Sequence, residues 1–463
     1  MIRASLALSA VLLLAVLAPF ASAWQIETVD TGIVGAYSSL KVDSGDGVHI
    51  SHFAGSVGHL KYAHYDGFAW SNETVDGEYL TGHSTSLDLD SMDRPRIAYR
   101  FYSGRCIRFA AWTGTNWTFT QFEEDGDMED FISMALDGAN LPHVSYHDGT
   151  FYGEASDLKY ARYDGASWTT EIVDAPGRVG RGSSLALDSA GHPHISYYDE
   201  TSATLKYAHF DGIEWTVTTL DNVEYIAFNF RTAIAVDSQD RVHIVYSSYH
   251  YQAPDWFGRL KYAMYDNAAW HIETIDEAAP TRDFRIPAIA VDRNDLPHVS
   301  YLLYFNVETY PSQLRYARFD GLTWEIEIIY YGMADSEHSN AIDLDSMGRP
   351  HVSYASADYK LMHAMGEVPA GAEGGPALSG GVMLLPPGGC PGREPRLRFW
   401  LPSACEVSLD ILDPAGRWVC TVAQGEFPAG SHTLTLGVRI LRGVYFCRLA
   451  AGEECVARKL VLP

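Results

Sequence analysis

A unit of about 49 residues recurs seven times in this chain, and this repeat restricts the fold more than any other feature. Each unit has an aspartate followed six residues later by a histidine or, once, an arginine: Asp43 with His49, Asp90 with Arg96, Asp137 with His143, Asp188 with His194, Asp237 with His243, Asp292 with His298 and Asp345 with His351. Tryptophans mark the same period, 46 to 55 residues apart: Trp24, Trp70, Trp117, Trp168, Trp215, Trp270 and Trp324. Such a period is typical of repeat architectures built from one supersecondary unit.

One unit, read closely, contains four short segments of alternating apolar and polar residues, at 184–187, 194–197, 205–210 and 215–220. Turn residues separate them, and Asp211-Gly212 is a strong hairpin signal. No segment has sustained helical periodicity. Four antiparallel strands, named A to D in chain order, repeated seven times, predict an all-β fold that is a seven-bladed β-propeller.

The two ends of the repeat predict how the ring closes. The segment 24–30 contains a tryptophan and precedes the first strand A, whereas the last unit ends near Gly366 after its strand C. We therefore expect 24–30 to supply the outer strand of the seventh blade and to pair with 360–364. That pairing would leave no open edge between the first and last blades.

The N-terminus predicts a signal peptide over 1–23. Arg3 precedes an apolar run of 13 residues at 6–18, and small residues follow at 21–23. The run is too short to span a membrane, and no other segment qualifies as transmembrane. The net charge of −26 argues against nucleic acid or an anionic membrane as a partner. We expect a secreted or cell-surface monomer that leaves the cytoplasm through the periplasm.

The C-terminal part breaks the repeat. Residues 367–396 are rich in Gly and Pro and predict a linker. Strand patterns return over 397–463 and predict a small Ig-like β-sandwich. The propeller thus occupies 24–366.

Two resemblances accompany this division. On turns such as Asp188-Ser189-Ala190-Gly191 and the strands around them, 24–366 resembles secreted bacterial seven-bladed propellers with sialidase-like or NHL-like repeats, although the sialidase Asp-box is absent. The tail resembles the sorting domain of type IX secretion substrates, related to the FlgD Ig-like module, on Leu401-Pro402, Asp413 to Gly416, Gly443 to Phe446 and Lys459 to Pro463. The second resemblance implies export by the secretion machinery, followed by release or surface attachment.

Cysteine usage agrees with an oxidising compartment. Five of the six cysteines lie in the tail: Cys390, Cys405, Cys420, Cys447 and Cys455. Cys447 and Cys455 flank a predicted hairpin turn at 450–453 and are the favoured disulfide. The odd number of cysteines in the tail leaves one of them as a free thiol or in a disulfide with Cys106. No Cys-x-x-Cys pair is present, so zinc is not expected.

The repeated aspartate and histidine predict a structural role. A residue present in nearly every blade serves the blade, because catalysis needs one or two special groups. We expect the aspartate to cap its own turn through backbone N–H groups, with the imidazole satisfying or packing against that turn. No cofactor or metal is expected; structural calcium at the Asp-rich turns is the alternative.

Loops that differ between blades are the better guide to a binding site. The A–B turn never changes length, but the B–C connection is long in three blades, at 147–157, 247–259 and 302–313. The D–A connections emerge on the same face and also vary. The aromatic residues of these long connections are candidate ligand-binding residues: Tyr249, Tyr251, Trp256, Tyr304 and Tyr310. Aromatic platforms with polar neighbours suit sugars; the alternative is that the loops only cover the blade edges.

A second candidate set stands just before strand A, near the central channel. Arg181, Arg231 and Arg285 come from consecutive blades, and His83 and His338 occupy the equivalent position in two others. Arginine recognises carboxylates with a two-pronged fork, and histidine exchanges protons near neutral pH. The set suits an anionic sugar; the alternative is that each arginine pairs with a local acid such as Asp283 or Glu337.

These observations favour a secreted or surface β-propeller that binds a glycan or another acidic extracellular ligand without turnover. The alternative is a carbohydrate-active enzyme at the channel mouth, either a uronate lyase or a glycosidase. A lyase would use an arginine to neutralise the carboxylate, with His83 or His338 as the catalytic base or acid. A glycosidase needs two opposed carboxylates, and the sequence does not single out such a pair.

Overall fold

A computed structural model gives the structure of this chain. It describes the residues 24–123, 131–149, 155–226, 231–280, 282–305, 312–332, 339–367, 383–388, 396–401, 404–413, 417–428, 430–435, 443–452 and 454–462. Over these ranges the fold is all-β, without a helix, as the repeat predicts. No helix in the described part of the chain is long and apolar enough to cross a membrane. The predicted signal peptide, 1–23, lies outside the described residues.

Seven four-stranded antiparallel sheets are found between residues 25 and 365, and each corresponds to one repeat. We call them blades 1 to 7. Blade 1 consists of β2 Ala36–Val42, β3 Val48–Ala54, β4 His59–Tyr65 and β5 Trp70–Asp76, and blade 2 of β6 Thr81–Leu89, β7 Pro95–Phe101, β8 Cys106–Trp112 and β9 Trp117–Phe122. Blade 3 consists of β10 Ser133–Leu136, β11 Pro142–Asp148, β12 Asp157–Tyr163 and β13 Trp168–Asp174, and blade 4 of β14 Val179–Leu187, β15 Pro193–Asp199, β16 Thr204–Phe210 and β17 Trp215–Asn222. Blade 5 consists of β18 Thr232–Val236, β19 Val242–Gln252, β20 Asp255–Tyr265 and β21 Trp270–Glu277, and blade 6 of β22 Arg282–Val291, β23 Pro297–Phe305, β24 Gln313–Phe319 and β25 Trp324–Tyr331. Blade 7 consists of β26 Asn340–Leu344, β27 Pro350–Ala355, β28 Leu361–Met365 and β1 Gln25–Asp30.

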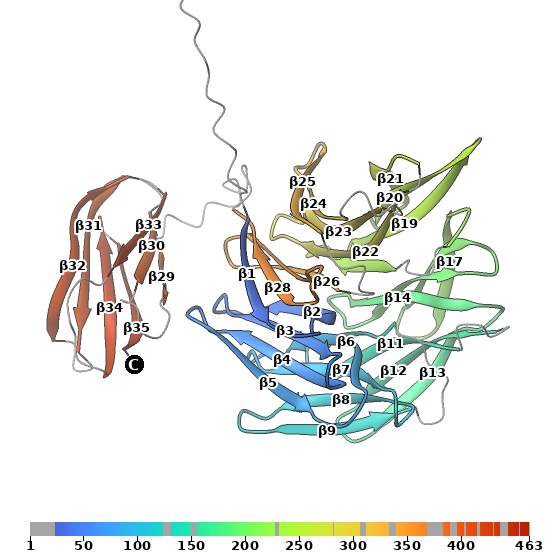
Figure 1. The fold of residues 1–463 in the computed structure, drawn as a ribbon, viewed down its shortest axis with the longest axis horizontal. Coiled ribbons are helices and arrows are strands. Elements are labelled where there is room, and N and C mark those ends of the chain that lie inside the picture. Colours follow the sequence, from blue (N-terminus) through green and yellow to red (C-terminus); the bar gives the residue numbers. More distant parts are fainter. Residues whose placement is uncertain are drawn as a thin grey trace, which may run out of the picture.

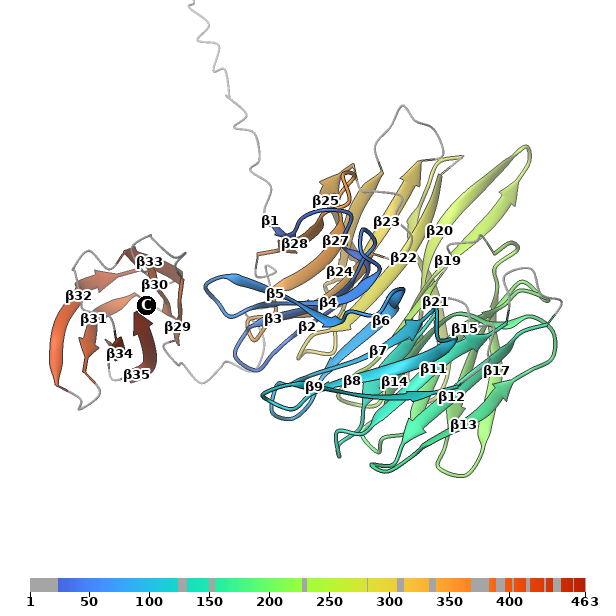
Figure 2. The same ribbon diagram turned by 60° about the horizontal axis from the view of Figure 1, so that its bottom comes forward.

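The blades succeed one another around a common centre, as Figure 1 shows, and the turned view in Figure 2 shows the same ring of sheets. Each strand A contacts strand A of the next blade, and β26 of blade 7 contacts β2 of blade 1. The strands A line one central channel. The molecule is therefore a β-propeller, and its blades form a closed ring.

Ring closure occurs through the N-terminal segment, which confirms the prediction. β1 pairs with β28 in antiparallel register, with Gln25 opposite Met365 and Thr28 opposite Met362. Trp24 is buried and packs edge-on against Tyr316 of blade 6 at 5.2 Å between ring centroids. β1 is therefore the outer strand of blade 7 and lies next to β28, the last strand C.

The repeated aspartate accepts hydrogen bonds from backbone N–H groups of its own A–B turn in all seven blades, and the repeated histidine bonds a tyrosine of strand C in five of them, which confirms their structural role. In blade 1, Asp43 Oδ1 accepts hydrogen bonds from the backbone N–H groups of Gly45 and Gly47. The other oxygen, Oδ2, lies 3.0 Å from His49 Nε2, and His49 Nδ1 lies 2.5 Å from the Tyr62 hydroxyl. The aspartate thus holds the A–B turn, and the histidine ties that turn to strand C.

Blade 2 holds its A–B turn with an equivalent aspartate but different partner residues. Arg96 replaces the histidine and its Nη2 donates to Asp90 Oδ2 at 2.6 Å. Phe109 stands where blades 1, 3, 4, 5 and 6 have tyrosine and blade 7 has His363, since a guanidinium needs no hydroxyl partner there. The A–B turn is again held by its aspartate, whose Oδ1 accepts from the N–H groups of Met92 and Arg94.

The repeated tryptophans join neighbouring blades. Trp117 of blade 2 packs edge-on against Tyr62 of blade 1 at 5.6 Å, and its indole N–H donates to Glu73 at 2.9 Å. The same two contacts recur further round the ring at Trp215, with Tyr160 and Glu171. Tryptophan recurs because each blade needs this contact with its neighbour.

The C-terminal unit contains two further sheets, of three and four strands. Their strands are β29 Met383–Gly388, β30 Arg396–Leu401, β33 Gly430–Thr435, and β32 Trp418–Phe427, β31 Cys405–Leu412, β34 Gly443–Ala451, β35 Glu454–Leu462. The apolar faces of β30 and β31 pack together, with Phe399, Leu409 and Leu449 fully buried. This is the predicted β-sandwich, but it begins inside the predicted linker 367–396, because the short apolar segment at β29 pairs with β30.

The favoured disulfide between Cys447 and Cys455 is not formed. In the β34–β35 register Cys447 lies opposite Arg458, whereas Cys455 lies opposite Ala450, so the two cysteines are not cross-strand partners. Cys447 is a free, buried thiol in the sandwich core, and burial raises its pKa to about 12. The sequence predicts the position of the hairpin turn correctly, but it does not determine which residues of the two strands lie opposite each other.

Candidate functional site

The connection 247–259 of blade 5 is a strand extension and not a loop. β19 and β20 are each 11 residues long and remain paired as far as Gln252 opposite Asp255. Glu224, from the D–A connection before blade 5, holds this hairpin: its carboxylate lies 2.9 Å from His250 Nδ1 and accepts from the Tyr251 backbone N–H at 2.9 Å. The hairpin is thus a supported platform that projects from the propeller (Figure 1).

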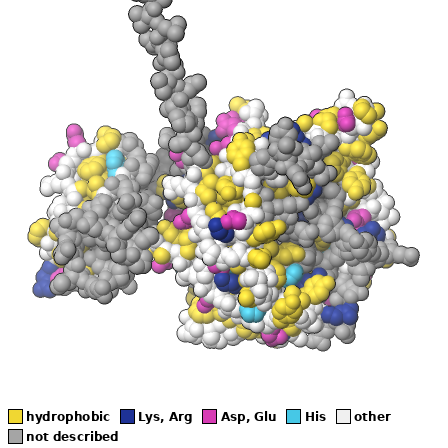
Figure 3. Space-filling model, in the orientation of Figure 1, with side chains coloured by type: hydrophobic (Ala, Val, Ile, Leu, Met, Phe, Trp, Pro, Cys, Tyr) yellow, Lys and Arg dark blue, Asp and Glu magenta, His cyan; other side chains and the backbone are white. Residues whose placement is uncertain are grey.

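Four aromatic side chains gather on this platform. Ring centroids are 5.0 Å apart for Tyr251 and Trp256, 6.2 Å for Tyr249 and Trp256, and 5.7 Å for Tyr225 and Tyr249. Three of them are strongly exposed: Trp256 by 45%, Tyr251 by 47% and Tyr225 by 56%. In the space-filling view, hydrophobic side chains gather at the edge where this hairpin projects (Figure 3).

A cleft of about 490 Å³ lies beside these rings. Its lining comes from three segments of the chain: Tyr225; Tyr249, Pro254, Asp255 and Trp256; and Arg282 and Asp283. We call it the aromatic cleft. The segments are the D–A connection before blade 5, the B–C hairpin of blade 5 and the start of blade 6. The repeat predicts B–C and D–A residues on one face, and in this cleft they meet.

Contacts within the cleft fix its polar groups. The Tyr249 hydroxyl donates to Asp283 Oδ2 at 2.9 Å, and Arg285 Nε lies 3.1 Å from Asp283 Oδ1. Burial, followed by the nearby Asp283 charge, raises the pKa of Tyr249, so this hydroxyl is protonated at neutral pH. Tyr225, Arg282 and Asp283 were not among the predicted site residues; the variable D–A connections were the signal that could have found them.

The three predicted arginines have different partners in the structure. Arg181 is only 3% exposed and its Nη1 donates to Glu200 at 2.7 Å. Arg231 lines the central channel and lies over the Phe131 ring at 5.0 Å, the ring that Arg181 also faces. Arg285 pairs with Asp283 and stacks on Tyr304 at 3.6 Å. Arg181 and Arg285 each pair with a nearby acidic residue, which was the alternative to a ligand-binding role. A ligand-binding role for the three arginines stays a prediction.

The remaining candidates fall in different places. His83 packs among the rings of Tyr37, Phe53 and Tyr102 at 5.2, 4.1 and 5.9 Å, where blades 1 and 2 meet. These contacts lie on blades distant from the aromatic cleft. His338 and Tyr310 lie outside the described residues. A catalytic role for either histidine stays a prediction.

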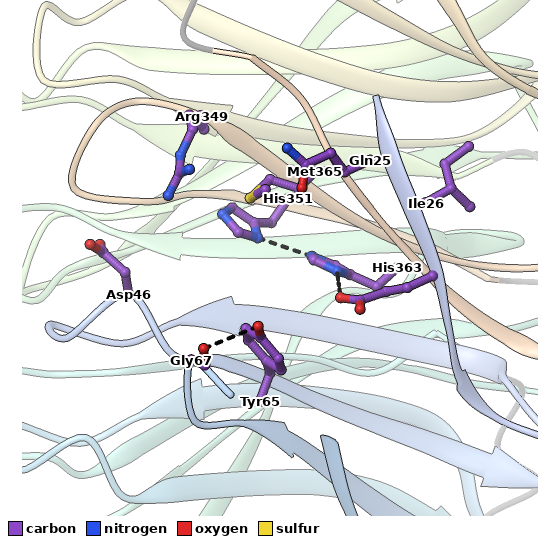
Figure 4. A pocket seen from close by; sticks show the side chains of 10 residues that line it. Gln25, Ile26, Asp46, Tyr65, Gly67, Arg349, His351, His363 and Met365 are labelled. Atoms are coloured by element: carbon purple, nitrogen blue, oxygen red, sulfur yellow. Dashed lines mark hydrogen bonds and ion pairs between the residues drawn. The ribbon is translucent and has the colours of Figure 1, made fainter. Parts of the chain in front are cut away.

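A smaller hollow of about 240 Å³ lies where blades 7 and 1 meet. Figure 4 shows His351 and His363 pointing toward one another, with His351 Nδ1 2.9 Å from His363 Nε2. His363 Nδ1 lies 3.0 Å from Glu27 Oε1 of β1. His363 takes the place that Tyr62 has in blade 1, so a histidine pair joins the closing strand to its blade.

This pair predicts that the folded protein is sensitive to acid. Burial lowers the pKa of His363 from 6.5 to about 4. Between those values the unfolded chain binds a proton that the folded chain does not, so the free energy of unfolding should fall with pH from 6.5 to about 4, by about 3 kcal/mol. Urea unfolding at pH 7.5 and pH 5 measures the loss. The variant His363→Tyr, with the residue that blade 1 uses, should lose less stability on acidification; an equal loss in both proteins would contradict the assignment.

No protein-family model matches the chain, and no curated protein matches its sequence. Among solved structures it is similar to a mutant of AofleA from Arthrobotrys oligospora, at 13% identity and a TM-score of 0.45, covering 66% of this chain and 89% of that one. It is also similar to the polysaccharide lyase Uly1, at 9% identity and a TM-score of 0.44, covering 72% and 90%. A third is PorZ, a surface component of the type IX secretion system of Porphyromonas gingivalis, at 14% identity and a TM-score of 0.40, covering 92% and 59%.

Likenesses of this degree carry no argument about what the chain binds. The class of protein is defined by the sheets themselves: a closed β-propeller followed by a β-sandwich. Its most distinctive surface is the aromatic cleft on blade 5.

Proposed function

We propose that this protein is a glycan-binding β-propeller and that the aromatic cleft is its binding site. The observation that carries the proposal is the convergence of Tyr225, Tyr249, Tyr251 and Trp256 from two chain segments beside a polar floor. Leaving large aromatic rings in water is unfavourable, so a cluster of them on a projecting hairpin indicates an interaction site.

The chemistry of the cleft suits a sugar. The C–H face of a pyranose ring packs on an indole or phenol face, while its hydroxyl groups need donors and acceptors at the rim. Trp256 supplies an exposed indole, and Asp255, Asp283 and Arg282 supply the polar groups. The rings are held by Glu224 and by the long β19–β20 pairing, so little side-chain ordering is needed on binding.

The charge of the cleft favours a neutral glycan. Two carboxylates and one guanidinium line it, and Asp283 is already neutralised in part by Arg285. We therefore propose a neutral glycan in place of the acidic ligand that the arginines of the sequence suggested. An acidic ligand at the channel, near Arg231, stays a separate prediction.

The enzyme alternative finds less support in this cleft. A lyase would need a group that removes a proton, and the raised pKa of Tyr249 keeps its hydroxyl protonated. A glycosidase would need two carboxylates facing each other across a sugar, but Asp283 is engaged by Tyr249 and Arg285. Incubation with the bound glycan, followed by product analysis, separates a binder from an enzyme.

Replacement of Trp256 by alanine should weaken glycan binding at least about tenfold, or about 1.4 kcal/mol, because the exposed stacking face is lost. Thermal stability should barely change, since the indole lies at the tip of a hairpin. A glycan array, followed by titration calorimetry with the best glycan, measures the effect. Trp418→Ala removes another exposed tryptophan, on the C-terminal unit, and should bind as the parent does. Equal binding by the Trp256 variant would refute the proposal.

Export remains a proposal from the sequence. The sandwich unit carries the segments that resemble a sorting domain, and we propose that it delivers the propeller to the cell surface or medium. Surface delivery would place the aromatic cleft among extracellular glycans.

A further inference from the structure

We propose that blade 4 contains a zinc site formed by Asp188, His194 and His209, with His192 as the fourth ligand. One ligand atom each from Asp188, His194 and His209 lies within 4.8 Å of the others. His192 Nδ1 lies 3.3 Å from Asp188 Oδ2. The site is at the A–B and C–D turns, the opposite edge of the blade from the B–C and D–A connections, so it is independent of the proposed glycan site.

The first argument is charge. In blades 2, 5 and 7 an arginine neutralises the repeated aspartate at the position equivalent to His192: Arg94 with Asp90, Arg241 with Asp237 and Arg349 with Asp345, at 2.8, 2.6 and 2.5 Å. Blades 3 and 6 have an arginine opposite the repeated histidine, Arg162 and Arg318. Among the described residues, the ion-pair partners of Asp188 are both histidines. A bound cation would supply the positive charge that arginine supplies elsewhere.

The second argument is an unsatisfied nitrogen. His194 is buried, and its Nε2 has no hydrogen-bond partner among the described residues, since Asp188 Oδ2 is 3.6 Å away. Its other nitrogen, Nδ1, lies 2.5 Å from the Tyr207 hydroxyl. A hydrogen bond on one imidazole nitrogen orients the ring so that the other can bind a metal, which is the usual arrangement around zinc. Asp188 Oδ1 is occupied by the turn, so Oδ2 is the oxygen left for a ligand.

The third argument is spacing. Zinc binds nitrogen and oxygen at about 2.1 Å in a tetrahedron, whose ligand atoms are then about 3.4 Å apart. The separation of 3.3 Å between His192 Nδ1 and Asp188 Oδ2 matches that edge and is particular to blade 4, whereas the 3.6 Å from His194 to Asp188 recurs in blades 3 and 6 at 3.6 and 3.7 Å. His209 stacks on His194 at 4.3 Å between ring centroids and is only half-buried, so rotation of its side chain can complete the set.

Blade 1 provides an internal comparison. It also places an aspartate and two histidines together, Asp43, His49 and His64. There His49 Nε2 is satisfied by Asp43 at 3.0 Å, and Gly47 stands where blade 4 has His192. We therefore expect blade 1 to bind zinc more weakly than blade 4.

Titration calorimetry of the untagged, EDTA-treated full chain with ZnCl2 tests the site. One equivalent should bind tightly, and Co²⁺ should give the strong visible absorption of tetrahedral coordination. His209→Met carries the residue of blades 5 and 7, and His192→Leu carries that of blades 3 and 6, so both should fold. Each should weaken zinc binding at least about 100-fold, because loss of an outer hydrogen bond alone costs 10–100-fold. His64→Met in blade 1 should leave the tight site unchanged.

Circular dichroism confirms the fold of each variant. Zinc should raise the melting temperature of the parent and of His64→Met, but not that of His209→Met or His192→Leu. The absence of zinc binding by the parent, or equal binding by folded His209→Met and His192→Leu, would overturn the proposal. A tight site that is lost only in His64→Met would also overturn it.

Discussion

Removal of residues 24–30 should open the ring and reduce the free energy of unfolding by more than about 5 kcal/mol. Trp24 alone, 5% exposed against Tyr316, accounts for about 3 to 5 kcal/mol by analogy with other buried aromatic residues truncated to alanine. The deletion also exposes Leu361 and Ala364, which are fully buried under β1, and leaves Lys61 without Asp30. Thermal unfolding followed by circular dichroism measures the change.

Point variants distinguish the effect of losing ring closure from the effect of shortening the chain. Trp24→Ala should lower the melting temperature strongly, whereas Gln25→Ala, an exposed position on the same strand, should leave it near that of the parent. A deletion variant as stable as the parent would show that β1 does not close the propeller.

Asp237→Ala should destabilise the propeller by about 3 to 5 kcal/mol, because two backbone N–H groups and His243 Nε2 lose a buried acceptor, and each buried group left unsatisfied costs about 1 to 3 kcal/mol. Asp237 Oδ1 accepts from the N–H groups of Gln239 and Arg241. Its Oδ2 accepts from Arg241 Nε at 2.6 Å and lies 3.0 Å from His243 Nε2. One substitution therefore removes the cap of a turn, a partner of His243 and one of the two carboxylate partners of Arg241, whose Nη2 also lies 3.4 Å from Asp295 Oδ2.

Asp266 of the same blade is the matched control. It also accepts hydrogen bonds from two backbone N–H groups in its turn, those of Ala268 and Ala269, but its side chain is exposed. Asp266→Ala should cost less than about 1 kcal/mol, since solvent replaces the lost partners. Denaturant unfolding of both variants at pH 7.5 makes the comparison. Equal losses would show that the buried aspartate unit does not stabilise the blade.

The blades could be predicted because their stabilising contacts repeat. The aspartate that holds the A–B turn and the tryptophan that contacts the next blade recur at fixed spacing, so the period reports the contacts. The closing strand could be predicted for the same reason, since Trp24 is the member of the series without a strand A before it.

The site could be predicted only in part, because it depends on contacts between segments that do not repeat. The pairing of Arg181 in β14 with Glu200 in the B–C connection of the same blade does not recur with the period. The length of 247–259 predicts a long connection, yet Tyr249 and Tyr251 alternate with His250 as in a strand, and the hairpin continues to Gln252. The zinc candidate does not follow from the repeat, because the repeated histidines belong to every unit but one, whereas the combination of His192 and His209 is particular to blade 4.

The central claim is that the aromatic cleft holds a glycan, and the structure of the complex tests it most directly. Crystals of the full chain with the best glycan from the array should show a sugar ring stacked on the Trp256 indole, with hydroxyl groups bonded to Arg282 or Asp283. Binding of that glycan at the central channel near Arg231, or on the face of the A–B turns, with the aromatic cleft left empty, would contradict the account.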